Sequence, residues 1–274
     1  MTVLRDKVIL LTGAGGGLGI EMVSQFLQEG SLLVLSDHPS VALTERIKSI
    51  KQQASTAGRI LGIISMDLSD SEGCLRLWEA CQSIHPSLDI LVNNAGIALL
   101  GPHHLIPSEK WEKLMQINLL SPMRLTQLIV PHMIQRRSGH IVNISSVAGQ
   151  VGPPNLASYA ASKFGLRGFG EALSEELLPH DVFVTQIYPF FTRTPILDSQ
   201  RFGGIDVQVP DNGPIYEPAF VIRELIQGIK KNQLHVFPGA IPKAIVTTYR
   251  FFPSLVPYLS RLSMKRINKP SPRK

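Results

Sequence analysis

The sequence predicts a single α/β domain, in which helices flank a doubly wound, parallel β-sheet. Two observations support this fold class. Short apolar runs rich in β-branched residues alternate with stretches of helical periodicity along most of the 274 residues. The first run leads into a glycine-rich turn, and a later one ends in two serines before a loop broken by Gly and Pro. Alternating elements of this kind form parallel sheets, with the loops after the strands along one edge.

The first expected strand is Lys7–Leu11, and a helix follows at Ile20–Gln28. The turn between them, residues 12–19, is rich in glycine. A strand, a glycine turn and a helix N-terminus together present backbone N–H groups to a pyrophosphate. The strict pattern G-x-G-x-x-G fails, because its last position falls on Leu18. We nevertheless expect this turn to bind a cofactor; the alternative is a turn without a ligand.

The second expected strand, Ser31–Ser36, ends at Asp37. An acidic side chain at this point can accept hydrogen bonds from an adenosine ribose and repels a 2′-phosphate. The glycine turn contains no Lys or Arg that would attract a phosphate. The sequence therefore favours NAD over NADP. The alternative is that Asp37 only opens the turn before Pro39.

The later elements continue the alternation. Ser69 and Glu72 form a capping pattern near the start of one helix. The expected helices are Val41–Ala57, Ser69–His85, Ser108–Gln135 and Phe220–Lys230, and the expected strands are Arg59–Met66, Leu88–Val92, Asp181–Tyr188 and Leu234–Phe237.

Composition is that of a globular protein, with 44% hydrophobic and 18% charged residues. Cys74 and Cys81 lie seven apart on one expected helix, which favours core packing over a metal or redox pair, and no metal site is expected. No apolar run reaches the roughly 18 residues of a membrane span. Because the first strand begins at Lys7, no room is left for a signal peptide, and we expect a cytoplasmic protein.

The net charge of +6 is unevenly distributed. No Asp or Glu follows Glu224, whereas ten of the 27 Lys and Arg residues do. Residues 1–224 carry 17 basic and 21 acidic side chains. A mildly acidic body with a basic tail does not predict nucleic-acid binding.

Candidate chemistry is concentrated in residues 139–177. An apolar strand ends in Ser145 and Ser146, and a helix opens at Tyr159, which places Tyr159 and Lys163 one turn apart on one face. A free tyrosine titrates near pH ~10, and a nearby ammonium lowers that pKa, so the phenol can exchange a proton near neutrality. The alternative is a surface tyrosine with a solvated lysine, and two serines that merely end a strand.

Ser146, thirteen residues before Tyr159, and Lys163, four after it, resemble the catalytic pattern of the short-chain dehydrogenase/reductase family. The spacing Gly13-x-x-x-Gly17-x-Gly19 and the tetrapeptide at residues 93–96 resemble two further motifs of its single-domain, NAD(P)-dependent branch. The resemblance covers about residues 5–240 and implies a Rossmann-type fold. Ser145 fits the family's spacing less well than Ser146.

The resemblance also implies roles for other positions. Asn118 would support Lys163 through water, Asp67 would lie beside the adenine, and Thr194 would contact the nicotinamide carboxamide. The family usually has Gly after the proline at position 189, where this chain has Phe190, and the effect on cofactor contacts is left open. The expected cofactor-binding residues are Gly13, Gly17, Leu18, Gly19, Asp37, Asp67, Leu68, Asn94, Ala95, Gly96, Tyr159, Lys163, Thr192 and Thr194.

The expected function is hydride transfer between NAD and an alcohol or carbonyl carbon. Tyr159 would be the acid/base, Lys163 would lower its pKa and hold the ribose, and Ser146 would orient the substrate oxygen. A lipophilic substrate is expected from Phe190, Phe191, Ile196, Leu197 and Phe202, unless these residues only pack the loop. The alternatives are an NADP-dependent ketoacyl-type reductase, which Asp37 disfavours, and an NAD-binding protein without turnover.

The expected boundaries are a catalytic domain at 1–240 and a basic, partly apolar extension at 241–274. The extension either rests on a membrane surface or covers the substrate entrance or a subunit contact. The helices around Asn118 and after Tyr159 are apolar on more than one face, which predicts a homodimer or homotetramer. Substrate identity and reaction direction stay open.

Overall fold

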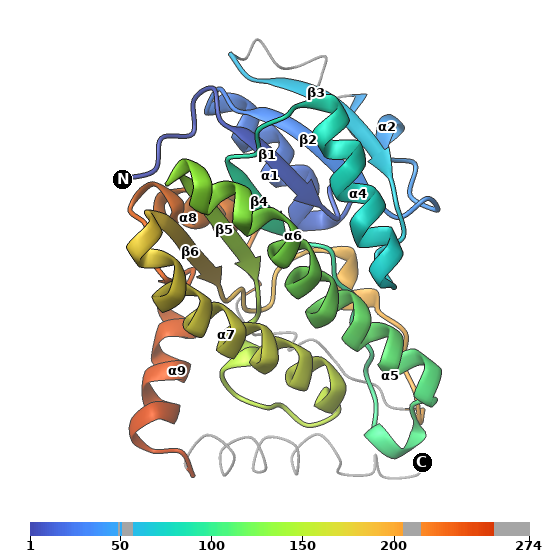
Figure 1. The fold of residues 1–274 in the computed structure, drawn as a ribbon. Coiled ribbons are helices and arrows are strands. Elements are labelled where there is room, and N and C mark those ends of the chain that lie inside the picture. The colour runs from blue at the N-terminus through green and yellow to red at the C-terminus, as the bar shows by residue number, and fades with distance from the viewer. Residues whose placement is uncertain (49, 51–56, 205–214, 255–274) are drawn as a thin grey trace, which may run out of the picture.

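A seven-stranded parallel sheet forms the centre of the molecule, in the order β3-β2-β1-β4-β5-β6-β7 (Figure 1). This computed structural model describes residues 1–48, 50, 57–204 and 215–254. The predicted doubly wound α/β fold is confirmed. The strands are β1 Val8–Thr12, β2 Leu32–Asp37, β3 Arg59–Ser65, β4 Ile90–Asn93, β5 Gly139–Ile144, β6 Val182–Ile187 and β7 His235–Val236.

Helices cover both faces of the sheet (Figure 1). Ile9 and Leu11 of β1 pack in the apolar layer under α1 (Gly17–Gln28) and α8 (Pro218–Lys230). Val8 and Leu10 pack in the opposite layer, under α4 (Ser71–Ile84), α6 (Ser121–Arg136) and α7 (Ala157–Leu177). Because both faces are buried, the strands read as continuous apolar runs. Further helices are α2 Leu43–Arg46, α5 Ser108–Met115 and α9 Ala240–Phe251.

The start of α4 differs from the expected capping pattern. Asp70, in extended conformation, is the N-cap, and its Oδ1 accepts the Gly73 N–H at 2.6 Å. The Ser69 N–H is instead bound to Asp67 Oδ1 at 2.9 Å, so the chain is still turning at this residue. The prediction of a cap at Ser69 was therefore wrong. Cys74 and Cys81 on this helix are fully buried, which confirms their interpretation as core residues.

The long helix expected at Ser108–Gln135 contains a π-helical turn, Gln116–Leu120, between α5 and α6. Asn118 lies in this turn and is fully buried. Its Oδ1 accepts the Ile97 N–H and its Nδ2 donates to the Ile97 carbonyl, both at 2.9 Å. The turn thus binds the loop after β4. Local π turns occur often at functional sites.

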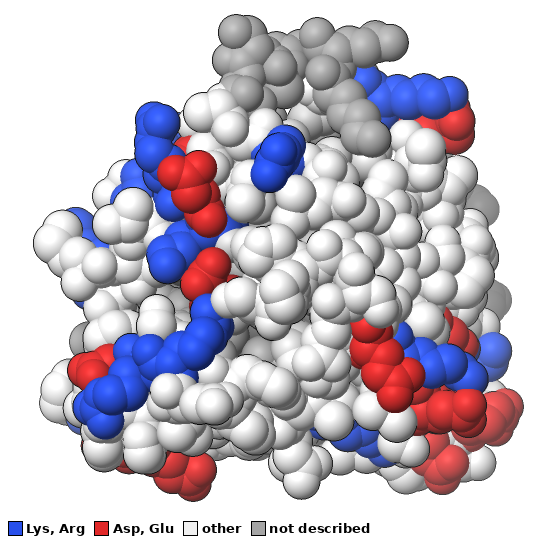
Figure 2. Space-filling view, turned by 45° about the horizontal axis from the view of Figure 1, so that its top comes forward, with Lys and Arg blue, Asp and Glu red and all other residues white. Residues whose placement is uncertain are grey.

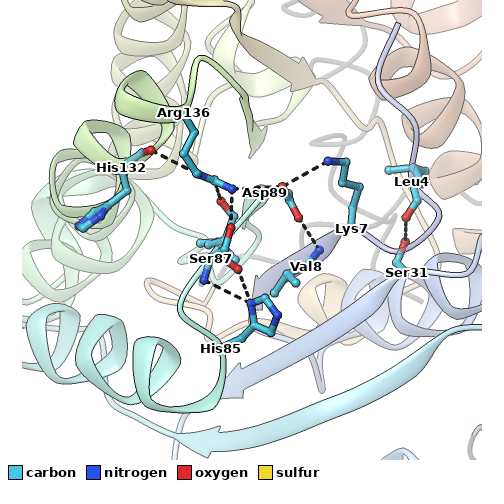
Figure 3. A network of polar contacts seen from close by, with 10 residues as sticks. Leu4, Lys7, Val8, Ser31, His85, Ser87, Asp89, His132 and Arg136 are labelled. Carbon is cyan, nitrogen blue, oxygen red and sulfur yellow. Dashed lines mark hydrogen bonds and ion pairs between the residues drawn. The ribbon is translucent and has the colours of Figure 1, made fainter.

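A network of polar contacts stabilises the edge of the sheet formed by the amino ends of the strands (Figure 3). Asp89 Oδ2 accepts the Val8 N–H at 2.9 Å, and Asp89 Oδ1 lies 3.4 Å from the cationic groups of both Lys7 and Arg136. Arg136, at the end of α6, also donates to Ser87 Oγ. These contacts tie β1, the segment before β4, and α6 together, far from the carboxyl ends of the strands.

Charged residues of both signs lie side by side toward the margins of the face shown in Figure 2, around a broad uncharged area. This face therefore carries no large patch of a single sign. Exposed ion pairs among the described residues are separate contacts, such as Arg137 with Asp181 at 2.9 Å and Arg76 with Glu72 at 2.5 Å. In the part of the chain that the structure describes, no helix is long and apolar enough to cross a bilayer.

Three expected segments fall partly outside the described residues. These are the C-terminal part of the helix at Val41–Ala57, residues 205–214 of the loop before α8, and the tail from residue 255. Most of the described part of the extension is α9, which ends at Phe251, two residues before Pro253. Pro242 lies in its first turn, where the ring costs no helical hydrogen bond, and α9 continues to Phe251.

Candidate active site

A cleft of about 1250 Å³ runs along the carboxyl edge of the sheet, where parallel α/β folds bind ligands. The glycine turn and the ends of β2 and β3 line one end, and residues 97–100 with Ile245 of α9 line the other. The loop after β6 borders both, since Thr194 lies against Gly17 and Arg201 forms a β-bridge with Leu100.

All the expected catalytic and cofactor-binding residues except Gly19 and Asn118 line this cleft. The structure therefore brings together residues that are up to 181 positions apart, from Gly13 to Thr194. Phe202, expected in the substrate pocket, packs instead against the apolar cluster of Leu99, Ile106 and Leu114.

Glycine is required at several points of the first turn. Gly13 has a φ of +64°, and a Cβ there would lie 2.8 Å from the Ala95 Cα. A Cβ at Gly19 would lie 2.2 Å from the Gly13 carbonyl oxygen, so Gly19 acts from behind the cleft by close packing. A Cβ at Gly17 would meet Thr194 at 2.6 Å. The first residue of α1 is thus covered by the loop after β6, with the helix N-terminus beside the cleft.

Asn94 braces the glycine turn from the neighbouring strand. Its Nδ2 donates to the Thr12 and Gly13 carbonyl oxygens, at 3.0 and 2.8 Å. Thr12 Oγ1 in turn accepts the Asn94 and Ala95 N–H groups, both at 3.1 Å. The tetrapeptide at residues 93–96 therefore fixes the shape of the glycine turn, and its last residue, Gly96, lines the cleft.

The two serines after β5 have different partners. Ser146 Oγ hydrogen-bonds the Tyr159 phenol and accepts the Ala148 N–H at 3.1 Å. Ser145 Oγ donates instead to the backbone oxygen of Lys163 at 3.2 Å. Successive residues of an extended chain point to opposite sides, so only one of the pair can face the phenol. The geometry favours Ser146 for contact with a substrate oxygen.

Lys163 lies beneath the Tyr159 ring. Its Nζ is 5.8 Å from the ring centre and donates to the Ile144 carbonyl at 2.8 Å. The side chain is buried, and burial lowers its pKa to about 8, because a charged amine loses hydration there. Lys163 nevertheless stays mostly charged at pH 7.

The pKa of Tyr159 differs in direction from the sequence-based expectation. Tyr159 is partly exposed in the cleft, yet surrounding protein desolvates its phenol and raises the pKa, an effect that the Ser146 hydrogen bond only partly offsets. The nearby ammonium does not reverse this shift, because loss of hydration penalises the phenolate more. Tyr159 is accordingly protonated at neutral pH and can serve as a proton donor.

Asn118 lies behind the cleft and not on its surface. Its Nδ2 also donates to Ser162 Oγ at 3.2 Å, one position before Lys163. A Cβ at Gly96 would lie 3.3 Å from Asn118 Oδ1 and 3.7 Å from Lys163 Nζ, so both groups approach the same glycine. Support of Lys163 by Asn118 stays a prediction.

Phe190 occupies the cleft wall without backbone strain, since its φ is not positive. Its ring packs edge-on against Phe191, with 4.7 Å between ring centres. Thr192 Oγ1 donates to the Phe190 carbonyl at 2.8 Å, and Thr194 Oγ1 donates to the Thr192 carbonyl at 3.3 Å. The loop after β6 therefore keeps both threonines on the cleft despite the unusual residue.

Sequence reasoning missed several residues of the cleft. His38, Ser40 and Arg46 surround Asp37 at one end, and Ile245 reaches the other end from α9. None belongs to a periodic pattern or a motif, so only the path of the chain reveals them. Asp67, expected near the adenine, lies 3.4 Å from His38 Nε2; burial acts to raise its pKa, but hydrogen bonds from Ser69 lower it overall.

In the described ranges, no group of three or more His, Cys, Asp and Glu side chains is placed to hold a metal ion. The cofactor that the fold implies fits the residues present at one end of the cleft. The helix N-terminus and the glycine turn, in which side chains larger than hydrogen would clash, suit a pyrophosphate. The Asp37 carboxylate beside the turn suits a ribose.

Comparison with known proteins gives the family. Residues 7–202 match the family model for short chain dehydrogenases. The chain is 32% identical over 195 residues to the 3-oxoacyl-[acyl-carrier-protein] reductase FabG of Thermotoga maritima, covering 71% of this chain and 78% of the relative. It is 30% identical over 237 residues to human epidermal retinol dehydrogenase 2, covering 85% and 74%.

A solved structure shows the same fold. The NAD complex of a short chain dehydrogenase/reductase from Burkholderia phymatum aligns with a TM-score of 0.80 at 22% identity, over 93% of this chain and 96% of that one. The family match covers the glycine turn, β1–β6, and the serine, tyrosine and lysine at the cleft. The chain therefore belongs to the short-chain dehydrogenase/reductase family of nucleotide-dependent oxidoreductases.

Proposed function

We propose that the protein transfers a hydride between NAD and a lipophilic primary or secondary alcohol, or the corresponding carbonyl compound. One observation carries this proposal. The Ser146 hydroxyl, the Tyr159 phenol and the Lys163 amine meet on the wall of a single cleft, between its glycine-rich end and its apolar end. A protein that only bound a nucleotide would not need this set.

In the proposed complex, the glycine turn and the N-terminus of α1 hold the pyrophosphate, and Asp37 accepts ribose hydroxyl groups. Asp67 and Leu68 border the adenine, and Asn94 to Gly96, Thr192 and Thr194 border the remainder of the cofactor. All of these residues line the cleft. The bound nicotinamide supplies or accepts the hydride. The protein's part is to place the reacting carbon against it and to handle the proton.

Tyr159 moves that proton. In reduction, its phenol donates a proton to the carbonyl oxygen, and in oxidation the phenolate takes one from the hydroxyl. Ser146, hydrogen-bonded to the phenol, holds the same oxygen. The Lys163 ammonium stabilises the phenolate that forms in reduction and would hold the ribose. Asn118 positions Lys163 from behind Gly96.

The apolar end of the cleft supports a lipophilic substrate. Leu99 and Leu100 come from the loop after β4, Leu156 precedes α7, and Phe191 follows β6. A pocket of apolar side chains with a few polar groups at one point orients an apolar molecule by its oxygen. The relative named as a retinol dehydrogenase is consistent with this substrate class. The relative named as an oxoacyl-carrier reductase supports the alternative, an NADP-dependent ketoacyl-type reductase.

We propose a boundary at residue 240, with 1–240 as the catalytic domain and 241–274 as an extension. Ile245 lines the cleft, so the extension would also complete the substrate end. On α9, Ile241 and Phe251 are exposed apolar residues, and Lys243 and Arg250 are exposed cations. This arrangement suits peripheral contact with an anionic membrane surface, from which a lipophilic substrate could enter.

We also propose a homodimer or homotetramer built through α6 and α7. Both helices carry an exposed large apolar residue, Met123 at 37% and Phe164 at 38% exposure. A second copy would cover them. Sedimentation at micromolar concentration should show an oligomer, and a monomer would contradict this.

The activity is tested with a panel of alcohols and carbonyl compounds of increasing chain length, each with NAD(H) and NADP(H), followed at the absorbance of the reduced nicotinamide. We expect turnover with NAD(H), and kcat/KM that rises with the apolar size of the substrate. Turnover confined to thioester-linked ketoacyl substrates with NADPH would favour the alternative. Cofactor binding without turnover on any compound would favour a binding protein.

A further inference from the structure

Asp37 and Arg46 bind opposite ends of the same residue in the glycine turn. The Gly15 N–H donates to Asp37 Oδ2 at 2.7 Å, and the Gly15 carbonyl accepts from Arg46 Nη1, also at 2.7 Å. Both side chains line the cleft, beside His38 and Ser40. The Asp37 carboxylate and the Arg46 guanidinium therefore both flank the end of the cleft that would receive the adenosine ribose, where Asp67 and Lys113 also belong to the lining.

The guanidinium retains capacity for a ligand. Arg46 is exposed, and within the described ranges the Gly15 carbonyl is the one acceptor that it has. Lys48, two residues further along the chain, is engaged by a carboxylate: its Nζ lies 2.6 Å from Glu45. A guanidinium carries more N–H donors than this single hydrogen bond uses. The remaining donors of Arg46 stay available at the cleft.

The carboxylate, in contrast, is partly occupied. Asp37 Oδ2 accepts the Gly15 N–H, and Oδ1 accepts the His38 N–H at 2.7 Å. Two short hydrogen bonds from backbone groups direct positive dipoles at this carboxylate and weaken its repulsion of a second anion. The Asp37 charge alone therefore does not describe the electrostatics of this subsite.

We propose that Arg46 is a second specificity-determining residue, which recognises a 2′-phosphate on the adenosine ribose. Asp37 sets the preference for NAD, and Arg46 limits that preference, so the cleft also binds NADP. This rests on the proposed function, in which the cleft holds a nicotinamide dinucleotide. A planar guanidinium with several N–H groups is the side chain best suited to a phosphate.

A simpler role for Arg46 would be to brace the glycine turn through the Gly15 carbonyl. That role predicts equal losses of affinity for both cofactors, because the turn would hold the pyrophosphate common to them. Recognition of the 2′-phosphate predicts a loss confined to the phosphorylated cofactor. The two roles are separated by variants that keep either the hydrogen bond or the charge.

The experiment compares the dissociation constants of NADH and NADPH, measured by cofactor fluorescence on the full chain at constant ionic strength. Arg46→Gln keeps an amide donor for Gly15 and removes the charge, whereas Arg46→Lys keeps the charge. We expect Arg46→Gln to weaken NADPH binding about tenfold and NADH binding less than about twofold. Arg46→Lys should retain most of the NADPH affinity, and the control Lys48→Gln should leave both affinities unchanged.

Asp37→Ala serves as the reference for the opposite effect, since removing the carboxylate should narrow the preference for NADH. Equal losses for both cofactors in Arg46→Gln, or an unchanged ratio, would overturn the inference alone. A wild-type chain that binds NADH but no NADPH would also overturn it. A wild-type chain that binds neither cofactor would overturn the proposed function as well, so the two failures are distinguishable.

Discussion

The Lys163 amine and the Ile144 carbonyl are joined by a hydrogen bond of 2.8 Å at the end of β5. This bond fixes the amine beneath Tyr159, and in the described part of the chain no carboxylate pairs with it. A carbonyl dipole offsets the cost of burying an ammonium less than an opposite charge would. The pKa of Lys163 accordingly falls to about 8, so its titration lies in a pH range where cofactor binding can be measured.

Affinity for NADH should therefore fall as the pH rises through about 8. Below this pH Lys163 is an ammonium that can hold the ribose, and above it the amine is neutral. Dissociation constants measured between pH 6.5 and 9.5 should show one step in wild type and no step in Lys163→Met. A step that persists in the variant would assign the titration to another group.

Replacing Tyr159 by Phe should abolish turnover and leave NAD affinity nearly intact. The substitution removes the proton donor, while the proposed contacts to the pyrophosphate and the adenosine lie at the other end of the cleft. Steady-state rates and equilibrium binding measure the two effects. The control Tyr249→Phe changes a tyrosine on α9 that is not among the cleft residues. Substantial activity in the Tyr159 variant would move the acid/base role elsewhere.

The neighbouring serines provide a matched pair. Ser146→Ala should lower kcat by about 10²-fold or more, because a donor to the reacting oxygen is lost. Ser145→Ala removes only a hydrogen bond to the Lys163 backbone oxygen, and we expect less than about a tenfold effect. Values of kcat for both variants with the same substrate show which serine contacts the reacting oxygen. A larger effect of Ser145→Ala than of Ser146→Ala would contradict the role given to Ser146.

His140 should make the protein sensitive to acid. Its Nδ1 and Nε2 are bound to Thr2 Oγ1 at 3.0 Å and Thr185 Oγ1 at 2.8 Å, and burial lowers its pKa to about 3. The unfolded histidine titrates near ~6.5, so between these values the unfolded state binds more protons and stability falls as the pH falls. This group contributes up to about 1.4 kcal/mol per pH unit within that window.

Denaturant unfolding at pH 7 and pH 5 measures this dependence. His140→Gln should be less stable at pH 7 but should show a shallower loss between the two values. The exposed His132 provides the control, since His132→Gln should leave the pH dependence of wild type unchanged. An identical pH dependence in His140→Gln and wild type would show that other groups dominate.

Contact of α9 with a membrane is tested on full-length protein with vesicles containing anionic lipid at low salt. We expect co-sedimentation of wild type, a loss in Phe251→Ser/Phe252→Ser, whose residues are 70% and 63% exposed, and a weaker loss in Lys243→Gln/Arg250→Gln. Leu75→Ser on α4 is the control for an exposed apolar residue elsewhere. Failure of wild type to bind would mean that α9 serves only the fold and the cleft.

Local pattern in the sequence determined the order of the elements and most residues of the cleft. The glycine turn, the tetrapeptide after β4 and the Ser146/Tyr159/Lys163 spacing are short-range features, because each depends on one turn or one helix. Parallel pairing then brings their loops to one edge without further information. For this reason the sequence alone predicts both the sheet and the family.

Tertiary structure decided what depends on contacts between distant segments. The cap at Asp70 and the π turn at Asn118 reflect hydrogen bonds that no local pattern encodes. Arg46 reaches Gly15, and Ile245 reaches the cleft, only through the path of the chain. The raised pKa of Tyr159 results from burial by surrounding protein, which spacing along a helix cannot express.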